Sequence, residues 1–126
     1  MSTHSSIGLV HFDGSVSLNF CHFDGYPSYN GRVLLEFYPT LDKVEKLVAL
    51  GDLSSLKETV DKCEINRNEP FFDCANYPDL NTVLDLAHID QCIEYMYLFV
   101  ESIGQWFLVT RNSRDLVFLT PSLCQE

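Results

Sequence analysis

Residues with acid, base and hydroxyl side chains gather in one short stretch, HFDGYPSYNG, at positions 22–31. A histidine and an aspartate beside hydroxyl groups could form an acid–base pair or activate a nucleophile. Catalytic triads, however, draw their members from separate places in a chain, and no nucleophile elbow or metal-binding helix motif accompanies this stretch. We therefore rank a structural role first, ligand or partner binding second and catalysis third. The side chains concerned are His22, Asp24, Tyr26, Ser28, Tyr29 and Asn30.

The tetrapeptide His-Phe-Asp-Gly occurs twice, at residues 11–14 and 22–25. In the first copy, the Asp-Gly pair lies between two alternating runs, where it favours a two-residue hairpin turn. Such a turn would pair His11 with Val16 and align the apolar residues of the two strands on one face. His11 and His22 would both lie on that face, and we interpret them as core histidines rather than as a metal pair.

Helices are expected after the second copy. Pro27 lacks the amide proton that a central strand needs, so the second copy is interpreted as a strand-to-helix loop. Further helix starts are indicated by Thr40 as an N-cap, by Ser55 with Glu58 as a capping box, and by Asn81 as an N-cap. The remaining polar stretch, residues 64–79, is interpreted as a loop. The expected helices cover residues 32–38, 40–51, 52–63 and 82–92.

The C-terminal part reads as strands. Residues 93–100 and 105–111 form a predicted hairpin, and both faces of each strand are apolar, as is typical of the centre of a covered sheet. Residues 116–120 indicate an edge strand. With the first hairpin, these patterns predict a single α+β domain over residues 1–126. It would contain an antiparallel sheet of about four to five strands, with two hairpins and three or four short helices packed on one face.

The charge of the chain argues against contact with polyanions. Its 126 residues carry a formal net charge of -10 with only eight Lys plus Arg, so phosphate backbones and anionic lipid surfaces would repel it. We expect no direct nucleic-acid or membrane binding. The acid excess is interpreted either as a solvated surface or as a face that docks on a basic partner. If a phosphorylated ligand binds, the scarce Arg32, Arg111 and Arg114 are the candidates to hold it.

The cysteines indicate a reducing compartment. Five are present, an odd number, with no Cys-x-x-Cys pair and no N-terminal segment of signal type. This pattern favours the cytoplasm and mostly buried thiols. Because the Cys and His residues are scattered, we expect neither a metal site nor a cofactor.

Three strings resemble a family of small proteins encoded by phages and prophages: STHSSIG at residues 2–8, HFDGYPSYNGRVLLEFY at 22–38 and KVEKLVALGDLSSL at 43–56. The family pattern has a Ser-Thr-x-Ser-x-Ile-Gly start, an aromatic-Asp-Gly-Tyr-Pro loop and a Gly-Asp-x-Ser-Ser-Leu segment. Phe23 stands where many relatives have Trp, and the middle of this chain is acidic where relatives tend to carry an Arg-containing motif. The resemblance covers about residues 2–56 and implies an accessory protein in the cytoplasm of an infected bacterial host.

Small acidic proteins of this kind commonly act by binding a host protein. We therefore expect a non-enzymatic protein that binds and inhibits a bacterial host protein with a basic surface, such as a defence or nucleic-acid-handling factor. A small-ligand protein that sequesters a signalling nucleotide is the alternative, and a small hydrolase using His22 and Asp24 ranks third. The acidic segment 64–79 is the expected contact. Its contact residues would be Glu64, Glu69, Phe71, Phe72, Asp73 and Asp79.

Overall fold

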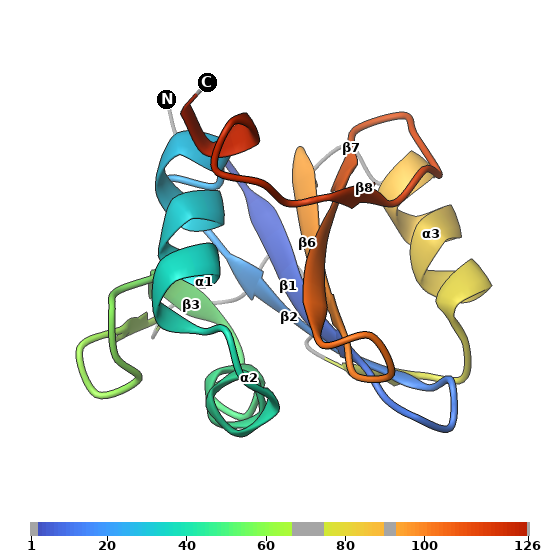
Figure 1. Ribbon diagram of the computed structural model, residues 1–126, viewed down its shortest axis with the longest axis horizontal. Coiled ribbons are helices and arrows are strands. Elements are labelled where there is room, and N and C mark those ends of the chain that lie inside the picture. The colour runs from blue at the N-terminus through green and yellow to red at the C-terminus, as the bar shows by residue number, and fades with distance from the viewer. Residues whose placement is uncertain (1–2, 67–74, 90–92, 126) are drawn as a thin grey trace.

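A computed structural model describes residues 3–66, 75–89 and 93–125 (Figure 1). The described residues form one sheet of eight strands in the order β4-β3-β2-β1-β6-β7-β8, with β5 paired to β2 outside this path. The two predicted hairpins are its centre. They are β1 (Ser5–Val10) with β2 (Val16–Cys21), and β6 (Tyr95–Val100) with β7 (Gln105–Thr110). The α+β class is confirmed, whereas the predicted number of four to five strands is too small.

The sheet is mixed rather than antiparallel as predicted. β1 and β6 run parallel side by side, with Ser5 opposite Tyr95 and Val10 opposite Val100. β2 and β3 (Leu53–Ser55) also run parallel. Parallel neighbours need a long crossover connection, and these crossovers contain the helices. The two hairpins are therefore joined through their first strands, a pairing that local sequence patterns do not reveal.

Helices cover both faces of the sheet (Figure 1), not one face as predicted. α1 (Arg32–Phe37) and α2 (Leu41–Val48) lie on one face, and α3 (Leu80–Ile89) lies on the other. The first face buries an apolar core that includes Ile7, Leu9, Leu34, Leu47, Tyr97 and Trp106. The second buries a separate core that includes Val16, Leu18, Phe20, Val83, Met96 and Leu98.

The first hairpin forms, but its register differs by one residue from the predicted one. Val16 pairs with Val10, not with His11. The turn is a three-residue loop, in which Gly14 N–H donates to the His11 carbonyl at 2.9 Å and His11 N–H donates to the Ser15 carbonyl at 2.8 Å. Gly14 has a positive φ of 92°, as expected for a type I turn closed by a glycine bulge.

The two cores explain this error. The observed register sends Ile7 and Leu9 to the face of α1 and α2, and it sends Val16, Leu18 and Phe20 to the face of α3. Register is strongly specified when one face is buried and the other is wet. Here most apolar residues of β1 lie in one core and most of those of β2 lie in the other, so alignment of the apolar residues on one face selects the wrong pairing.

The predicted helices at 32–38 and 40–51 are confirmed with changed ends, and the one at 82–92 is confirmed up to Ile89, since residues 90–92 lie outside the described residues. α1 follows directly on a single π-helical turn, η1 (Pro27–Gly31), and Thr40 occupies the N-cap position of α2 with an extended backbone. α3 starts earlier than predicted, because Asp79 rather than Asn81 caps it. The Thr82 backbone N–H and its hydroxyl each donate to the Asp79 carboxylate at 2.8 Å.

The helix predicted over residues 52–63 is wrong, because residues 53–55 form β3 and residues 58–63 form turns. The N–H groups of His22 and Phe23 donate to the carbonyls of Leu53 and Ser54 at 2.9 and 3.0 Å. Pairing with a distant strand therefore overrides the local capping box.

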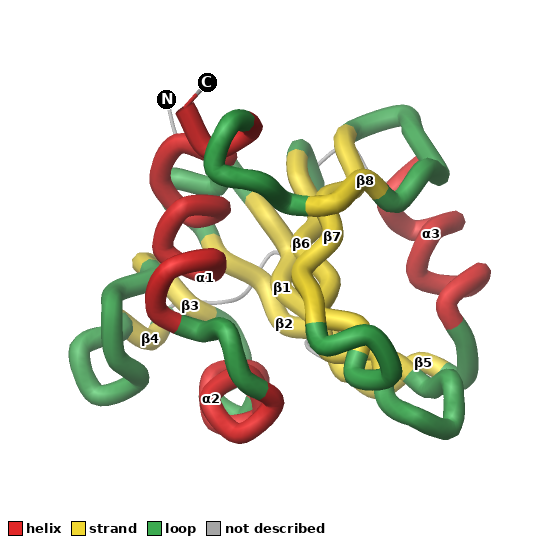
Figure 2. Tube along the Cα trace, in the orientation of Figure 1, coloured by secondary structure: helices red, strands yellow, loops and turns green. Residues whose placement is uncertain are grey.

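Short strands complete the edges of the sheet (Figure 2). The predicted loop 64–79 contributes β4 (Glu64–Ile65), antiparallel to β3, and β5 (Ala75–Tyr77), antiparallel to the first half of β2. The predicted edge strand is confirmed as β8 (Val117–Phe118), and a 3-10 turn, η2 (Leu123–Gln125), follows it and contacts η1.

Candidate functional site

Residues 22–31, named the 22–31 loop from here on, are held tightly against the sheet. Gly25 N–H donates to the Thr3 carbonyl at 2.9 Å, and the buried Tyr97 hydroxyl donates to the Gly25 carbonyl at 2.6 Å. A Cβ at Gly25 would lie 2.8 Å from the Thr3 carbonyl oxygen, so this close approach requires glycine. Asp24 takes a left-handed φ of 58°, a conformation that aspartate tolerates better than most residues. The loop backbone is therefore rigidly positioned.

Two of the predicted binding residues in this loop point inward. Asn30 is 0% exposed, and its Nδ2 donates to Ser5 Oγ at 3.1 Å. The Tyr29 hydroxyl donates to the Leu56 carbonyl at 3.0 Å, and Ser28 is half-buried. The contacts of Asn30 and Tyr29 fix the loop to β1 and to the segment after β3.

The outer side of the loop presents aromatic groups. Phe23 is 48% exposed and Tyr26 is 38% exposed. The Tyr26 hydroxyl donates to Asp24 Oδ1 at 3.0 Å, and this hydrogen bond raises the pKa of Tyr26 above its ordinary value. The loop thus displays two aromatic rings with a carboxylate between them in the chain. Phe23 is not among the predicted binding residues, although it directly precedes Asp24 in the string that supplied them.

His22 is engaged away from the outer side of the loop. Its Nε2 lies 3.0 Å from Asp52 Oδ1, and Asn66 Nδ2 donates to Asp52 Oδ2 at 2.9 Å. The residue is 8% exposed, and its ring packs edge-on against Phe20, with ring centroids 4.8 Å apart. The side chains of His22 and Asp24 therefore form hydrogen bonds with different partners. Asp52 and Asn66 belong to the hydrogen-bonded group around His22, and the sequence did not indicate either of them.

The predicted partner contact in residues 64–79 is described only at its ends. Glu64 is exposed on β4, and Asp79 is exposed at the start of α3, where its hydrogen bonds from Thr82 lower the pKa of its carboxyl. The other predicted contact residues lie outside the described residues. They are Glu69, Phe71, Phe72 and Asp73.

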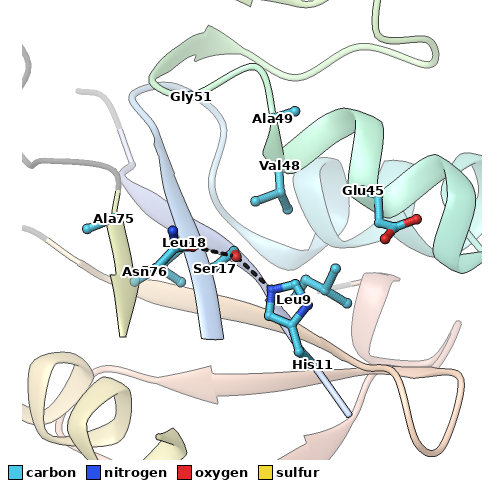
Figure 3. A pocket seen from close by; sticks show the side chains of 10 residues that line it. All are labelled: Leu9, His11, Ser17, Leu18, Glu45, Val48, Ala49, Gly51, Ala75 and Asn76. Carbon is cyan, nitrogen blue, oxygen red and sulfur yellow. Dashed lines mark hydrogen bonds between the residues drawn. The ribbon is translucent and has the colours of Figure 1, made fainter. Parts of the chain in front are cut away.

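A pocket of about 470 Å³ opens between α2, the ends of β1 and β2, and β5 (Figure 3). Inside it, His11 Nε2 lies 2.7 Å from Ser17 Oγ, and Ser17 Oγ donates to Asn76 Oδ1 at 2.7 Å. Glu45 of α2 also lines the pocket. Sequence patterns did not indicate this pocket, because β5 was read as loop and Ser17 appeared to be an ordinary strand residue.

Comparison with family models, with curated proteins and with solved structures found no match in any of the three. The site is therefore interpreted from its own chemistry.

Two buried thiols in the described part of the chain are weak nucleophiles. Burial raises the pKa of the Cys21 thiol to about 11 and also raises that of Cys124, which keeps both thiols protonated and poorly nucleophilic. Across residues 3–66, 75–89 and 93–125, no group of three or more His, Cys, Asp or Glu side chains could hold a metal ion. No helix in these ranges is long and apolar enough to cross a membrane.

Proposed function

We propose that this protein is a non-enzymatic accessory protein of a phage or prophage that binds and inhibits a host protein in the bacterial cytoplasm. The observation that supports this function best is the 22–31 loop, which holds Phe23 and Tyr26 in solvent on a rigid backbone. Aromatic side chains on a fixed scaffold are typical anchors of protein interfaces, because they bury a large area at little cost in side-chain entropy.

The electrostatics support a partner with a basic surface. The net charge of -10 favours encounter with a positively charged protein and disfavours nucleic acid. Within the loop, Asp24 provides a carboxylate beside the two aromatic rings. The same features support neither a hydrolase nor a nucleotide site in this loop: His22 and Asp24 bond different groups, and Tyr29 and Asn30 are used to hold the loop in place.

The test is affinity capture from a bacterial lysate with three immobilised proteins. They are the parent, a Phe23→Ser/Tyr26→Ser double variant, and a Phe12→Ser variant as the matched control. Phe12 belongs to the other His-Phe-Asp-Gly copy and is 75% exposed. It lies in the turn before β2, whereas the 22–31 loop lies after β2, so the control removes an exposed phenylalanine from a different loop. We expect a host protein on the parent and on the Phe12→Ser control, and its loss from the double variant.

Salt provides the second criterion. Exposed charges are screened at high ionic strength, so capture should weaken between about 0.05 M and 0.5 M salt. A captured protein that the double variant retains, or that only Phe12→Ser loses, would place the contact elsewhere. Absence of any specific partner at low salt would argue against the proposed function itself.

A further inference from the structure

The pocket between α2, β2 and β5 carries an inference that is independent of the partner contact. Its volume of about 470 Å³ falls within the range of small-molecule sites, about 300–1,000 Å³. Such sites combine apolar walls with a few convergent polar groups, and this pocket fits that description (Figure 3). Its walls include Leu9 and Val48, and its polar groups are His11, Ser17, Asn76 and Glu45.

The hydrogen bonds inside the pocket determine which groups remain for a ligand. A serine hydroxyl has one proton, and that of Ser17 is directed to Asn76 Oδ1. His11 Nε2 must then be the donor in its 2.7 Å contact with Ser17 Oγ. In the neutral ring this leaves Nδ1 as an acceptor, and Asn76 Oδ1 retains a second lone pair. The polar wall therefore offers acceptors in addition to the Asn76 amide protons.

The charge of the pocket favours a cation. Glu45 is exposed and, unlike Glu36 and Asp42 on the same side of the sheet, it has no ion-pair partner among the described residues. No Lys or Arg is among the described residues that line the pocket. A phosphate or carboxylate ligand would meet the Glu45 carboxylate with no compensating Lys or Arg among the described lining residues.

We propose that this pocket binds a small organic cation, an amine carried on an apolar or aromatic body. The protonated amine would bond to the Glu45 carboxylate, on the α2 side of the pocket. The apolar body would lie against Val48 of α2 and Ala49, the residue after it. A phosphorylated nucleotide is disfavoured, because the described residues that line the pocket include no arginine or lysine to pair with its phosphates.

An isosteric ligand series tests the charge preference. ¹⁵N-labelled protein is titrated with 3-phenylpropylamine, 3-phenylpropanol and 3-phenylpropionate, and amide chemical shifts are followed by NMR. We expect the amine to shift the amides of Ser17, Val48, Gly51 and Asn76 with a Kd on the order of 1 mM, as is usual for a fragment of this size. The alcohol should bind more weakly, and the carboxylate should bind most weakly of the three.

Two charge variants distinguish binding of the amine in the pocket from its non-specific electrostatic attraction to an acidic protein. Glu45→Gln removes the carboxylate of the pocket, and Glu36→Gln makes the same charge change on α1, where Glu36 pairs with Arg32. Glu45→Gln should weaken amine binding by about two- to fivefold, the range expected for an exposed ion pair, while Glu36→Gln should not.

Three results would overturn the proposal. They are binding of the carboxylate as tightly as the amine, amide shifts scattered away from the pocket, and equal effects of the two charge variants. If none of the three probes binds, the pocket is not a site for this ligand class. None of these results bears on the partner contact, because the 22–31 loop does not line this pocket.

Discussion

Removal of a single hydroxyl should loosen the loop that presents Phe23 and Tyr26. Tyr97 on β6 is 0% exposed, and its hydroxyl donates to the Gly25 carbonyl at 2.6 Å. Tyr97→Phe keeps the ring and its packing, so the change isolates this hydrogen bond. A buried polar group that loses its partner costs about 1–3 kcal/mol. Because Gly25 is buried and its carbonyl would lose this donor, we expect a loss of about 2 kcal/mol in the free energy of unfolding.

This loss corresponds to a clear thermal shift. With an unfolding entropy of about 2.1 cal/mol/K per residue, a chain of 126 residues loses about 8 °C in Tm for a destabilisation of about 2 kcal/mol. Thermal unfolding followed by circular dichroism measures the shift, and urea unfolding measures the free energy independently. Amide hydrogen exchange should show reduced protection of the Gly25 N–H, which donates to the Thr3 carbonyl.

Tyr95→Phe is the matched control. Tyr95 lies on the same strand, is half-buried, and its hydroxyl makes no hydrogen bond within the described residues. Its loss should therefore change stability by no more than about 0.5 kcal/mol. Equal and small shifts for the two variants would refute the reasoning, because the Gly25 carbonyl would then not depend on Tyr97 for its position.

Three further predictions concern the backbone, a helix cap and a thiol. Gly25→Ala should lower the urea midpoint strongly, because the added Cβ would lie 2.8 Å from the Thr3 carbonyl oxygen; a midpoint like that of the parent would contradict the close approach. Asp79→Ala should lower Tm at pH 7 by removing the cap of α3. Because the hydrogen bonds from Thr82 lower the pKa of Asp79, this stabilisation is present above the unfolded pKa and is lost as the pH falls through the folded value. The Tm values of parent and variant should therefore converge in acid, and a constant difference would refute the role of the ionised carboxylate. Burial raises the pKa of Cys21 to about 11, so iodoacetamide at pH 8 should label it far more slowly in the native chain than in urea. Peptide mass mapping measures the two rates, and equal rates would show that the thiol is accessible.

Elements with strong local signals could be predicted from the sequence. The hairpin of β6 and β7 could be predicted from two apolar runs separated by a short turn, and in the structure Gly104 of that turn adopts a positive φ of 74°. α2 was recognised from its apolar spacing after Thr40, and the structure buries Val44 and Leu47 as that spacing requires. In each case the decisive interactions lie within the segment itself.

The errors occur where distant segments decide the structure. Residues 53–55 carry a local helix signal, yet their backbone pairs with β2 and β4. The polar partners show the same dependence: His22 and Asp52 are 30 residues apart, and Ser17 and Asn76 are 59 residues apart. A pattern search along the chain sees each of these residues separately, and only the folded sheet brings them within hydrogen-bonding distance.

The two His-Phe-Asp-Gly copies illustrate how context shapes one short sequence. In the first copy Gly14 takes the positive φ, 92°, because strands pair on both sides of the turn. In the second copy Asp24 takes it, at 58°, while the following glycine is held against Thr3. Both copies nevertheless expose their phenylalanine, Phe12 by 75% and Phe23 by 48%.

The phenylalanine of the motif is therefore exposed in both copies, although their backbone conformations differ. Exposure of this ring does not by itself identify a contact surface. The 22–31 loop differs because Phe23 is joined there by Tyr26, whose hydroxyl bonds to the aspartate of the same loop. It also differs because its backbone is hydrogen-bonded to Tyr97 on β6 and to Thr3, which precedes β1. Comparison of the two phenylalanines in one capture experiment thus asks whether binding requires only an exposed ring or the rigid aromatic pair. Our reasoning predicts that the pair is required.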